Sequence, residues 1–424
     1  MKKTIAIIAL VAIALSSAHC QEVIHGSVRD DETKQGIPCA AIHLKDTYIG
    51  TACNESGQFI LHVPRGKEKA KVIVSSLGYL SDTISVQALI KKKGRVNLKP
   101  NTVQLEDVTV VEFASAKRLI DAVIEHIPQN YRTEDAVGIW HHRNRQMVND
   151  SLFVESEGLI RNYMPPYDGK MLSLSLYYGQ DSSEWNEELY RLYQRLDTVM
   201  VFNKDYWRSL VGPEFLDSKL KLQRYSYPSD CMETIGSDCV NYMRRKDLRI
   251  FTRKSKYTME TFSQDGEDYY RVTVAYKPRG RKTCDTLILV INKEVLAIVD
   301  AVHIQPLSPI WPNMYLQINP WYTNRLYTAR THWRYYKYDG KYQLDFIQRE
   351  YEHRFEFSQQ TINAGCQVSC LRLTGKEECI LAEYTYDGVE EYKRRYYDNK
   401  NPRTEENIKE TEYILRQPHN KIPW

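Results

Sequence analysis

Hydrophobic and polar residues alternate in seven short segments between residues 22 and 100, which is the pattern of β-strands. In QFILHV, residues 58–63, the side chains of Phe59, Leu61 and Val63 fall on one face, and the turn sequence NESG precedes them. The seven segments are EVIHGSVRD, CAAIHLKD, TYIGTAC, QFILHV, KAKVIVSSLGYL, SDTISV and GRVNLKP. Gly, Pro and Asn separate them, so residues 21–98 are predicted to form a small seven-stranded antiparallel β-sandwich.

The pattern changes after residue 98. Residues 99–113 are interpreted as a linker that ends in LEDVTVVE. Apolar residues at helical spacing then predict one helix near residues 116–127 and a second near residues 182–196. Alternating segments dominate elsewhere, so we expect residues 114–424 to form a β-rich domain, a large curved antiparallel sheet with a few helices.

The composition agrees with a chain rich in strands. The 424 residues include 31 tyrosines, and aromatic and β-branched residues favour strands. Two polar turns between alternating segments, Asn149-Asp150 and Asp339-Gly340, predict long hairpins. The formal net charge is +4 and no basic stripe stands out, so a nucleic-acid partner is not expected.

The first twenty residues predict export. Residues 1–20 have the features of a secretory signal peptide, since Lys2 and Lys3 precede an apolar run that small residues follow. The lipid-bearing cysteine of a bacterial lipoprotein follows a small residue, whereas Cys20 follows His19, so lipid anchoring at Cys20 is not expected. No later apolar stretch reaches the roughly 18 residues that a membrane helix needs, and we expect no transmembrane helix after the signal peptide.

Eight cysteines follow the signal peptide, and an exported protein meets an oxidising compartment. If the hairpin of residues 39–53 is centred on Asp46, Cys39 lies directly opposite Cys53. Residues opposed in this way have Cβ atoms about 4.5–5.5 Å apart, which a small adjustment brings within reach of a disulfide. We therefore predict a disulfide between Cys39 and Cys53. The pairing of the other six is left open: Cys231, Cys239, Cys284, Cys366, Cys370 and Cys379.

Three stretches of the N-terminal region, GSVRDDETKQGIPCAAIHL, IGTACNESGQFILHVPRG and SSLGYLSDTISV, resemble the carboxypeptidase-like regulatory domain. The resemblance implies a transthyretin-like (prealbumin-like) β-sandwich and no activity of its own. The sequence departs from the family pattern at Cys39, where the family usually carries Gly, and at Cys53-Asn54, which replace Thr-Asp. LEDVTVVE resembles the segment after this module in envelope proteins of Bacteroidetes-type bacteria. That likeness implies a Gram-negative host, with the protein in the periplasm, at the outer membrane or on the cell surface.

Strand geometry argues against the candidate catalytic and metal motifs of this chain. His353 and Glu356 form the H-x-x-E string of zinc peptidases, but in an alternating run their side chains point to opposite sides of a strand. His141 and His142 are adjacent, so for the same reason one ion would take only one of them. The chain carries no G-x-S-x-G elbow, P-loop or G-x-G-x-x-G motif. We expect no catalytic residue, no metal site and no cofactor.

An aromatic cluster supplies the candidate ligand-binding residues. IWPNMYLQINPWYTNRLY, residues 310–327, follows Pro309 and carries Trp311, Tyr315, Trp321 and Tyr322 around two further prolines. Aromatic rings beside Asn and Gln stack on sugars or anchor a protein partner, so the expected partner is an envelope protein or a glycan. The alternative is that the rings cover one end of the sheet.

Taken together, the sequence favours a non-enzymatic cell-envelope binding or assembly protein and does not name its ligand. One alternative is a lipid or lipoprotein carrier that uses a concave antiparallel sheet. The other is a glycoside or peptide hydrolase with an unrecognised site, because paired carboxylates about 5–10 Å apart have no short motif.

Overall fold

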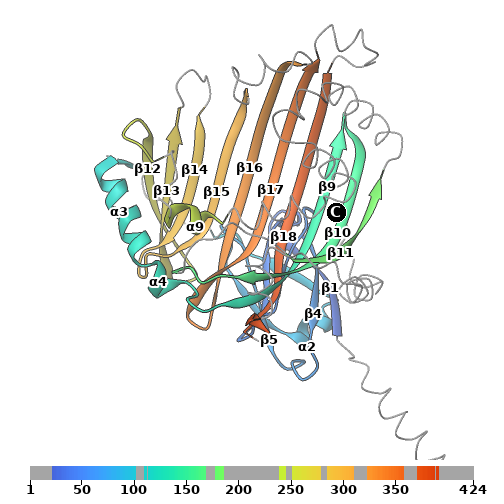
Figure 1. The fold of residues 1–424 in the computed structure, drawn as a ribbon. Helices are drawn as coiled ribbons and strands as arrows, with labels where there is room; N and C mark the ends of the chain where they lie inside the picture. Colours follow the sequence, from blue (N-terminus) through green and yellow to red (C-terminus); the bar gives the residue numbers. More distant parts are fainter. Residues whose placement is uncertain are drawn as a thin grey trace, which may run out of the picture. The chain divides into compact units, whose positions relative to one another are not determined.

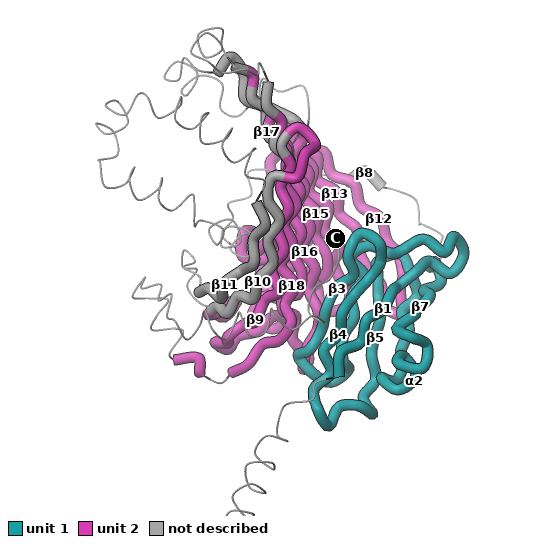
Figure 2. The backbone as a smooth tube through the Cα atoms, turned by 90° about the vertical axis from the view of Figure 1, so that its right-hand side faces the viewer, with its two compact units in different colours: residues 1–102, 416–424 teal, residues 103–415 magenta. Residues whose placement is uncertain are grey.

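The computed structural model describes residues 22–101, 109–111, 113–168, 177–185, 238–244, 251–277, 284–309, 322–357, 370–386 and 388–390. The chain divides into two compact units, which Figure 2 shows in different colours. Unit 1 comprises residues 1–102 and 416–424, and unit 2 comprises residues 103–415. The predicted signal peptide, residues 1–20, lies outside the described residues.

Unit 1 contains the seven predicted strands, arranged in two sheets. One sheet has the order β4-β1-β7 and the other the order β3-β2-β5-β6. The strands are β1 (Glu22–Asp30), β2 (Ala41–Leu44), β3 (Gly50–Ala52), β4 (Gln58–Val63), β5 (Lys71–Ser75), β6 (Asp82–Ser85) and β7 (Arg95–Leu98). Apolar side chains of both sheets form one core, in which Ile42, Phe59 and Leu61 are at most 1% exposed. The predicted β-sandwich is therefore confirmed.

Two features of unit 1 differ from the prediction. Strands β1 and β7 are parallel, with Ser27 opposite Arg95, so the sandwich is not entirely antiparallel. β1 is the first strand of unit 1 in the sequence and β7 is the last. No hairpin joins them directly, so no turn forces them to be antiparallel. A six-residue helix, α2 (Val86–Lys91), precedes β7, and the Ser85 hydroxyl caps it by accepting a hydrogen bond from the backbone N–H of Ala88 (3.2 Å).

The register of the β2–β3 hairpin is shifted by one residue from the prediction. Ala41 lies opposite Ala52, and the N–H of Cys53 donates to the carbonyl of Ala40 (2.9 Å). Cys53 points into the core and is fully buried, whereas Cys39 is partly exposed. Cys39 and Cys53 are not joined in a disulfide, and that prediction is wrong. The reason is that a one-residue shift moves a strand side chain to the opposite face.

The predicted turn at residues 54–57 is confirmed. The buried Asn54 side chain holds it, because Oδ1 accepts hydrogen bonds from the N–H groups of Ser56 (3.0 Å) and Gln58 (2.8 Å). Gly57 has a φ of +74°, a left-handed conformation that glycine adopts at no steric cost.

Unit 2 is built on an eleven-stranded sheet in which every neighbouring pair is antiparallel. Its order is β11-β10-β9-β18-β17-β16-β15-β14-β13-β12-β8. Figure 1 shows β12 to β18 side by side and then β9, β10 and β11. The strands are β8 (Thr109–Val111), β9 (Ala136–Val148), β10 (Ser151–Met164), β11 (Tyr177–Trp185), β12 (Lys256–Gln264), β13 (Glu267–Tyr276), β14 (Asp285–Asn292), β15 (Ile298–Pro309), β16 (Tyr322–Tyr338), β17 (Lys341–Phe357) and β18 (Cys370–Thr385). The predicted large antiparallel sheet is confirmed.

Both predicted hairpins of unit 2 are present. Asn149 and Asp150 join β9 to β10 with φ angles of 48° and 66°, and Asp339 and Gly340 join β16 to β17 with φ angles of 45° and 78°. Two successive left-handed residues are the signature of a type I′ turn, whose twist matches that of the flanking strands. Local turn chemistry therefore determines these two connections.

The described helices of unit 2 are α3 (Phe113–Glu125), α4 (Ile127–Asn130) and α9 (Cys239–Arg244). The helix predicted near residues 116–127 is confirmed as α3, which ends at Glu125, and Pro128 lies in the first turn of the short helix α4 that follows. No helix in the described part of the chain is long and apolar enough to cross a membrane.

Two boundaries in unit 2 need correction. The helix predicted near residues 182–196 is wrong for residues 182–185, which end β11, with Trp185 opposite Val154 of β10. Pairing with β10 satisfies the backbone hydrogen bonds of residues 182–185, and the spacing of apolar residues alone does not reveal such a partner strand. Residues 186–196 lie outside the described residues. The predicted linker, residues 99–113, contains β8, an edge strand paired with β12.

Candidate functional site

Polar side chains are concentrated at the centre of the large sheet, on β9, β17 and β18. His142, Arg143, Glu377 and Glu378 are each at most 2% exposed. Burying such groups costs free energy unless they are paired, so each position requires a partner. Because strand side chains alternate between faces, these residues divide into two groups, one on each face of the sheet.

The first group is a row of polar residues that crosses four neighbouring strands. Pairing places His332 opposite Gln348, Gln348 opposite Glu378, and Glu378 opposite Arg143. Arg143 forms an ion pair with Glu378, and Nε2 of Gln348 donates to the Glu378 carboxylate (2.8 Å). Two further ion pairs continue on the same face: His332 with Asp300 (2.7 Å) and Arg334 with Asp345 (2.8 Å).

The protonation of Glu378 reflects this environment. Burial acts to raise the pKa of the Glu378 carboxyl, but the positive charges of Arg143 and Lys376 outweigh it, so the pKa lies below its ordinary value. The Lys376 ammonium lies 3.3 Å from the carboxylate. Glu378 is therefore held as a charged, hydrogen-bonded carboxylate inside the protein.

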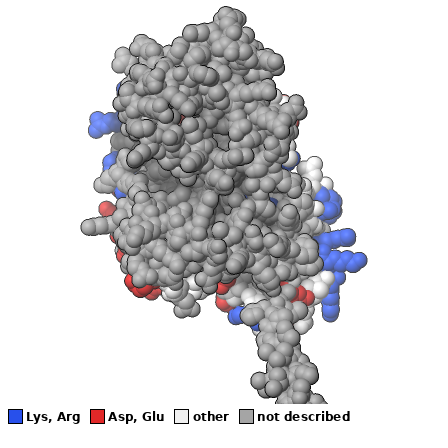
Figure 3. All heavy atoms as spheres, turned by 45° about the vertical axis from the view of Figure 1, so that its right-hand side comes forward, with Lys and Arg blue, Asp and Glu red and all other residues white. Residues whose placement is uncertain are grey.

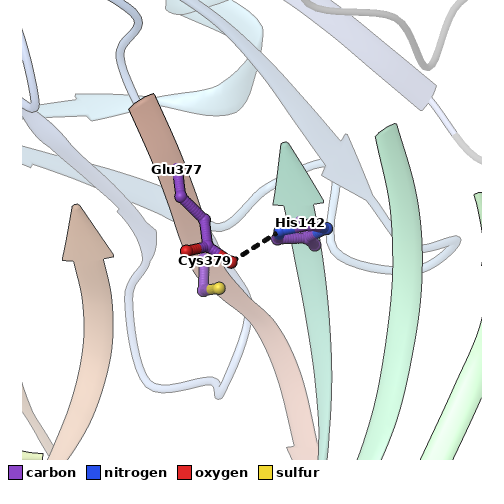
Figure 4. A group of neighbouring side chains, drawn as sticks. All are labelled: His142, Glu377 and Cys379. Carbon is purple, nitrogen blue, oxygen red and sulfur yellow. Dashed lines mark hydrogen bonds and ion pairs between the residues drawn. The ribbon is translucent and has the colours of Figure 1, made fainter. Parts of the chain in front are cut away.

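The second group lies on the opposite face and consists of His142, Glu377 and Cys379 (Figure 4). His142 is on β9, directly opposite Cys379 on β18, and Glu377 is two residues before Cys379, so all three share one face. Nε2 of His142 lies 3.1 Å from Oε1 of Glu377. One ligand atom from each of the three residues lies within 4.8 Å of the other two, and all three side chains are buried.

A buried amide side chain, that of Asn144, lies beside this group. It is directly opposite Glu377 and two residues after His142, hence on the same face, and it is 1% exposed. Within the described part of the chain, neither Nδ2 nor Oδ1 of its side chain has a hydrogen-bond partner. An unsatisfied buried polar group costs about 1–3 kcal/mol, so this amide requires an explanation.

A separate polar cluster surrounds Asp238 at the start of α9. Its carboxylate accepts hydrogen bonds from the hydroxyls of Tyr335 (2.6 Å) and Tyr167 (2.7 Å) and from the N–H of Val240 (2.9 Å). Burial raises the pKa of Asp238, and these hydrogen bonds act in the opposite direction. Asp238 thus caps the helix and fixes two buried tyrosines, a structural role.

Comparison with known proteins bears on the N-terminal region. Residues 24–110 match the family model of the CarboxypepD_reg-like domain. The predicted resemblance of this module is therefore confirmed. No curated protein matches the chain.

One solved structure is similar to this chain: the crystal structure of a "putative membrane-associated protein of unknown function" from Bacteroides fragilis NCTC 9343. It is 10% identical, and the match covers 87% of this chain and 99% of that chain with a TM-score of 0.15. At that TM-score the likeness supports no conclusion about fold or function.

None of the buried polar residues of the sheet belongs to the CarboxypepD_reg-like domain, since they all lie after residue 110. Of the predicted ligand-binding residues, Trp311, Tyr315 and Trp321 lie outside the described residues. Tyr322 is the first residue of β16, and only its backbone is described. The structure therefore leaves that site as a prediction.

The histidines singled out in the sequence lie on two strands, β9 and β17. His353 and Glu356 both lie within β17, as predicted, and His142 pairs with Cys379, whereas His141 pairs with Ile380. The sequence did not reveal that β9 pairs with β18, which follows more than 200 residues later in the chain. The available signal was the Glu377-x-Cys379 spacing, which places two metal-ligand side chains on one face of a strand.

Proposed function

We propose that this chain is a non-enzymatic binding or assembly protein of the bacterial cell envelope. The observation that supports it is the role of the charged groups at the centre of the large sheet. Arg143 and Glu378 neutralise each other at no more than 1% exposure, so neither reaches a substrate. A general acid or base must lie within hydrogen-bond reach of the group it protonates or deprotonates, and these residues do not meet that condition.

The match to the CarboxypepD_reg-like domain agrees with this proposal, because that fold implies no activity of its own. Figure 3 shows that both basic and acidic side chains are present on the described surface in view. This mixed charge is in keeping with the formal net charge of +4.

The proposed binding region is the connection between β15 and β16. β15 ends at Pro309 and β16 begins at Tyr322, so residues 310–321 join two long neighbouring strands of the sheet. This segment carries Trp311, Tyr315 and Trp321, and loops held by a rigid scaffold commonly carry binding residues. Tyr322 is paired with Phe357 of β17, which fixes the start of β16 to the sheet.

The test is binding by the full mature chain to a glycan array and to immobilised envelope extract, compared with a W311A/W321A double variant. We expect one glycan class or one reproducible envelope protein to be bound by the wild type and at least tenfold less by the variant. A matched F251A/Y276A variant, which removes two aromatic residues just before β12 and at the end of β13, should bind normally. Equal binding by all three proteins would refute the proposed region.

The same sample distinguishes the two alternatives. Lipid that survives purification in stoichiometric amount would support the carrier. Turnover of glycoside or peptide substrates that is lost on replacing a single carboxylate would support the hydrolase. Either result would contradict the proposal that the chain is a non-enzymatic binding or assembly protein.

A further inference from the structure

We infer that His142, Glu377 and Cys379 form a buried site for a zinc-type transition-metal ion, which the sequence had led us not to expect. The donors are an imidazole nitrogen, a carboxylate oxygen and a thiolate sulfur, all of which bind Zn²⁺. All three come from adjacent strands, β9 and β18, in the interior of the sheet (Figure 4).

The separation of the donor atoms suits a metal ion. Zinc binds nitrogen and oxygen at about 2.0–2.2 Å and sulfur at about 2.3 Å, so tetrahedral ligand atoms lie roughly 3.3–3.7 Å apart. The His142–Glu377 separation is 3.1 Å, and the three ligand atoms lie within 4.8 Å of one another. Side-chain rotations that move these atoms by about 1 Å are enough to reach metal-binding geometry.

The charges also suit a divalent ion. A thiolate and a carboxylate together balance the charge of Zn²⁺, and the imidazole binds in its neutral form. Charge balance matters here because Glu377 and Cys379 are no more than 1% exposed, where an uncompensated charge is costly. Arg349 lies opposite Glu377 on β17 and is partly exposed, so it is placed to orient the carboxylate from outside the ligand set.

Asn144 provides an independent indication of a ligand. Its buried amide has no hydrogen-bond partner among the described residues, and strand pairing places it on the same face as His142 and opposite Glu377. With a metal ion at the site, Oδ1 of Asn144 would be the fourth ligand of the ion, or would accept a hydrogen bond from a water molecule bound to the ion. Either arrangement satisfies an amide that is otherwise buried at a cost.

The expected role of the ion is structural. The ligand residues are no more than 2% exposed, whereas a catalytic ion needs an open position that substrate can reach. Metal binding would connect β9 to β18, two strands that are adjacent in the sheet but more than 200 residues apart in the chain. Because such a site does not exist in the unfolded chain, metal affinity adds to folding stability.

The test measures zinc content in the full chain. Protein is incubated with Zn²⁺, dialysed against metal-free buffer and analysed by mass spectrometry for metals. We expect about one zinc per wild-type chain and at least a tenfold lower content in H142Q and in C379S. The matched controls are H141Q, whose residue lies on the opposite face of the same strand, and C284S, which replaces an exposed cysteine. Both controls should retain zinc.

A spectroscopic measurement on the wild type keeps the test independent of whether the variants fold. Loading with Co²⁺ should give a thiolate-to-cobalt charge-transfer band and the visible spectrum of tetrahedral cobalt, and C284S should give the same spectrum. A wild type that retains less than a tenth of an equivalent of zinc, or that shows no thiolate–cobalt band, would overturn the inference. So would a loss of zinc in H141Q or C284S equal to that in H142Q or C379S.

Discussion

Cys39 has a φ of +57°, which places a residue with a Cβ atom in the left-handed region. Glycine is the residue that adopts this conformation without steric cost, and modules that resemble unit 1 usually carry Gly at this position. The departure from the family pattern is therefore best interpreted as a local backbone cost. It does not mark one half of a disulfide.

Replacing Cys39 with Gly should relieve this cost. We expect the free energy of unfolding to rise by about 0.5–1 kcal/mol, because the strain removed exceeds the additional entropy of glycine in the unfolded chain. C39A is the matched control, since it keeps the Cβ atom and should give no gain. Urea denaturation of both variants decides the matter, and equal stability of C39G and C39A would contradict the explanation.

At the Arg143–Glu378 pair, we expect a substitution to lower the free energy of unfolding. The isosteric change E378Q leaves the Arg143 charge buried without its counter-charge, and should cost about 3–5 kcal/mol. The control is D150N, which affects the Arg372–Asp150 pair, where the Asp150 side chain is 78% exposed. That change should cost less than about 1 kcal/mol in the same denaturation experiment. A loss in E378Q no larger than that in D150N would show that the buried pair does not stabilise the sheet.

The lowered pKa of Glu378 gives the pH dependence of this contribution. An acid whose pKa is lower in the folded state stabilises the fold above its unfolded pKa, and this stabilisation is lost as pH falls through the folded value. The stability difference between wild type and E378Q should therefore be constant near neutral pH and shrink on acidification below about 4.5. Taking the difference is necessary because burial raises the pKa of Asp238, whose effect on stability has the opposite pH dependence. A difference that stays constant down to the acid unfolding transition would contradict the assignment.

Among the secondary-structure elements, a tight turn connects β16 and β17, the two longest described strands. Gly340 has a φ of +78° in the turn between β16 and β17, and a Cβ atom added there would meet no atom within 4 Å. The cost of a side chain at this position is therefore conformational, without any steric contribution from packing.

We expect G340A to lower the free energy of unfolding by about 1 kcal/mol and G340N to lower it by less, because Asn tolerates the left-handed region. Thermal unfolding of both variants gives the comparison. Equal losses would show that the turn does not depend on left-handed geometry.

At the scale of the whole molecule, the chain consists of two compact units, and the boundary lies at residue 102. Unit 1 has its own core of buried apolar residues drawn from both of its sheets. Residues 21–102 expressed alone should therefore unfold in one cooperative transition. Calorimetry on this fragment checks the prediction, and a gradual transition without a defined heat-absorption peak would refute independent folding.

The local features of this protein can be predicted from short stretches of its sequence. The seven strands of unit 1, helix α3 and the type I′ turns at Asn149-Asp150 and Asp339-Gly340 all follow from side-chain periodicity and turn chemistry. These signals act between residues that are close in the chain, so short sequence patterns are sufficient to predict them.

The choice of neighbouring strands and their register could not be predicted from such patterns and follows from the folded sheet. The parallel pairing of β1 with β7, the pairing of β9 with β18 and the one-residue shift that separates Cys39 from Cys53 all depend on contacts between different strands. His142 and Cys379 meet for the same reason, although no spacing in the chain connects them. The physical cause is that a strand's own residues fix the alternation of its side chains, whereas its partner and register depend on the packing of the complete sheet.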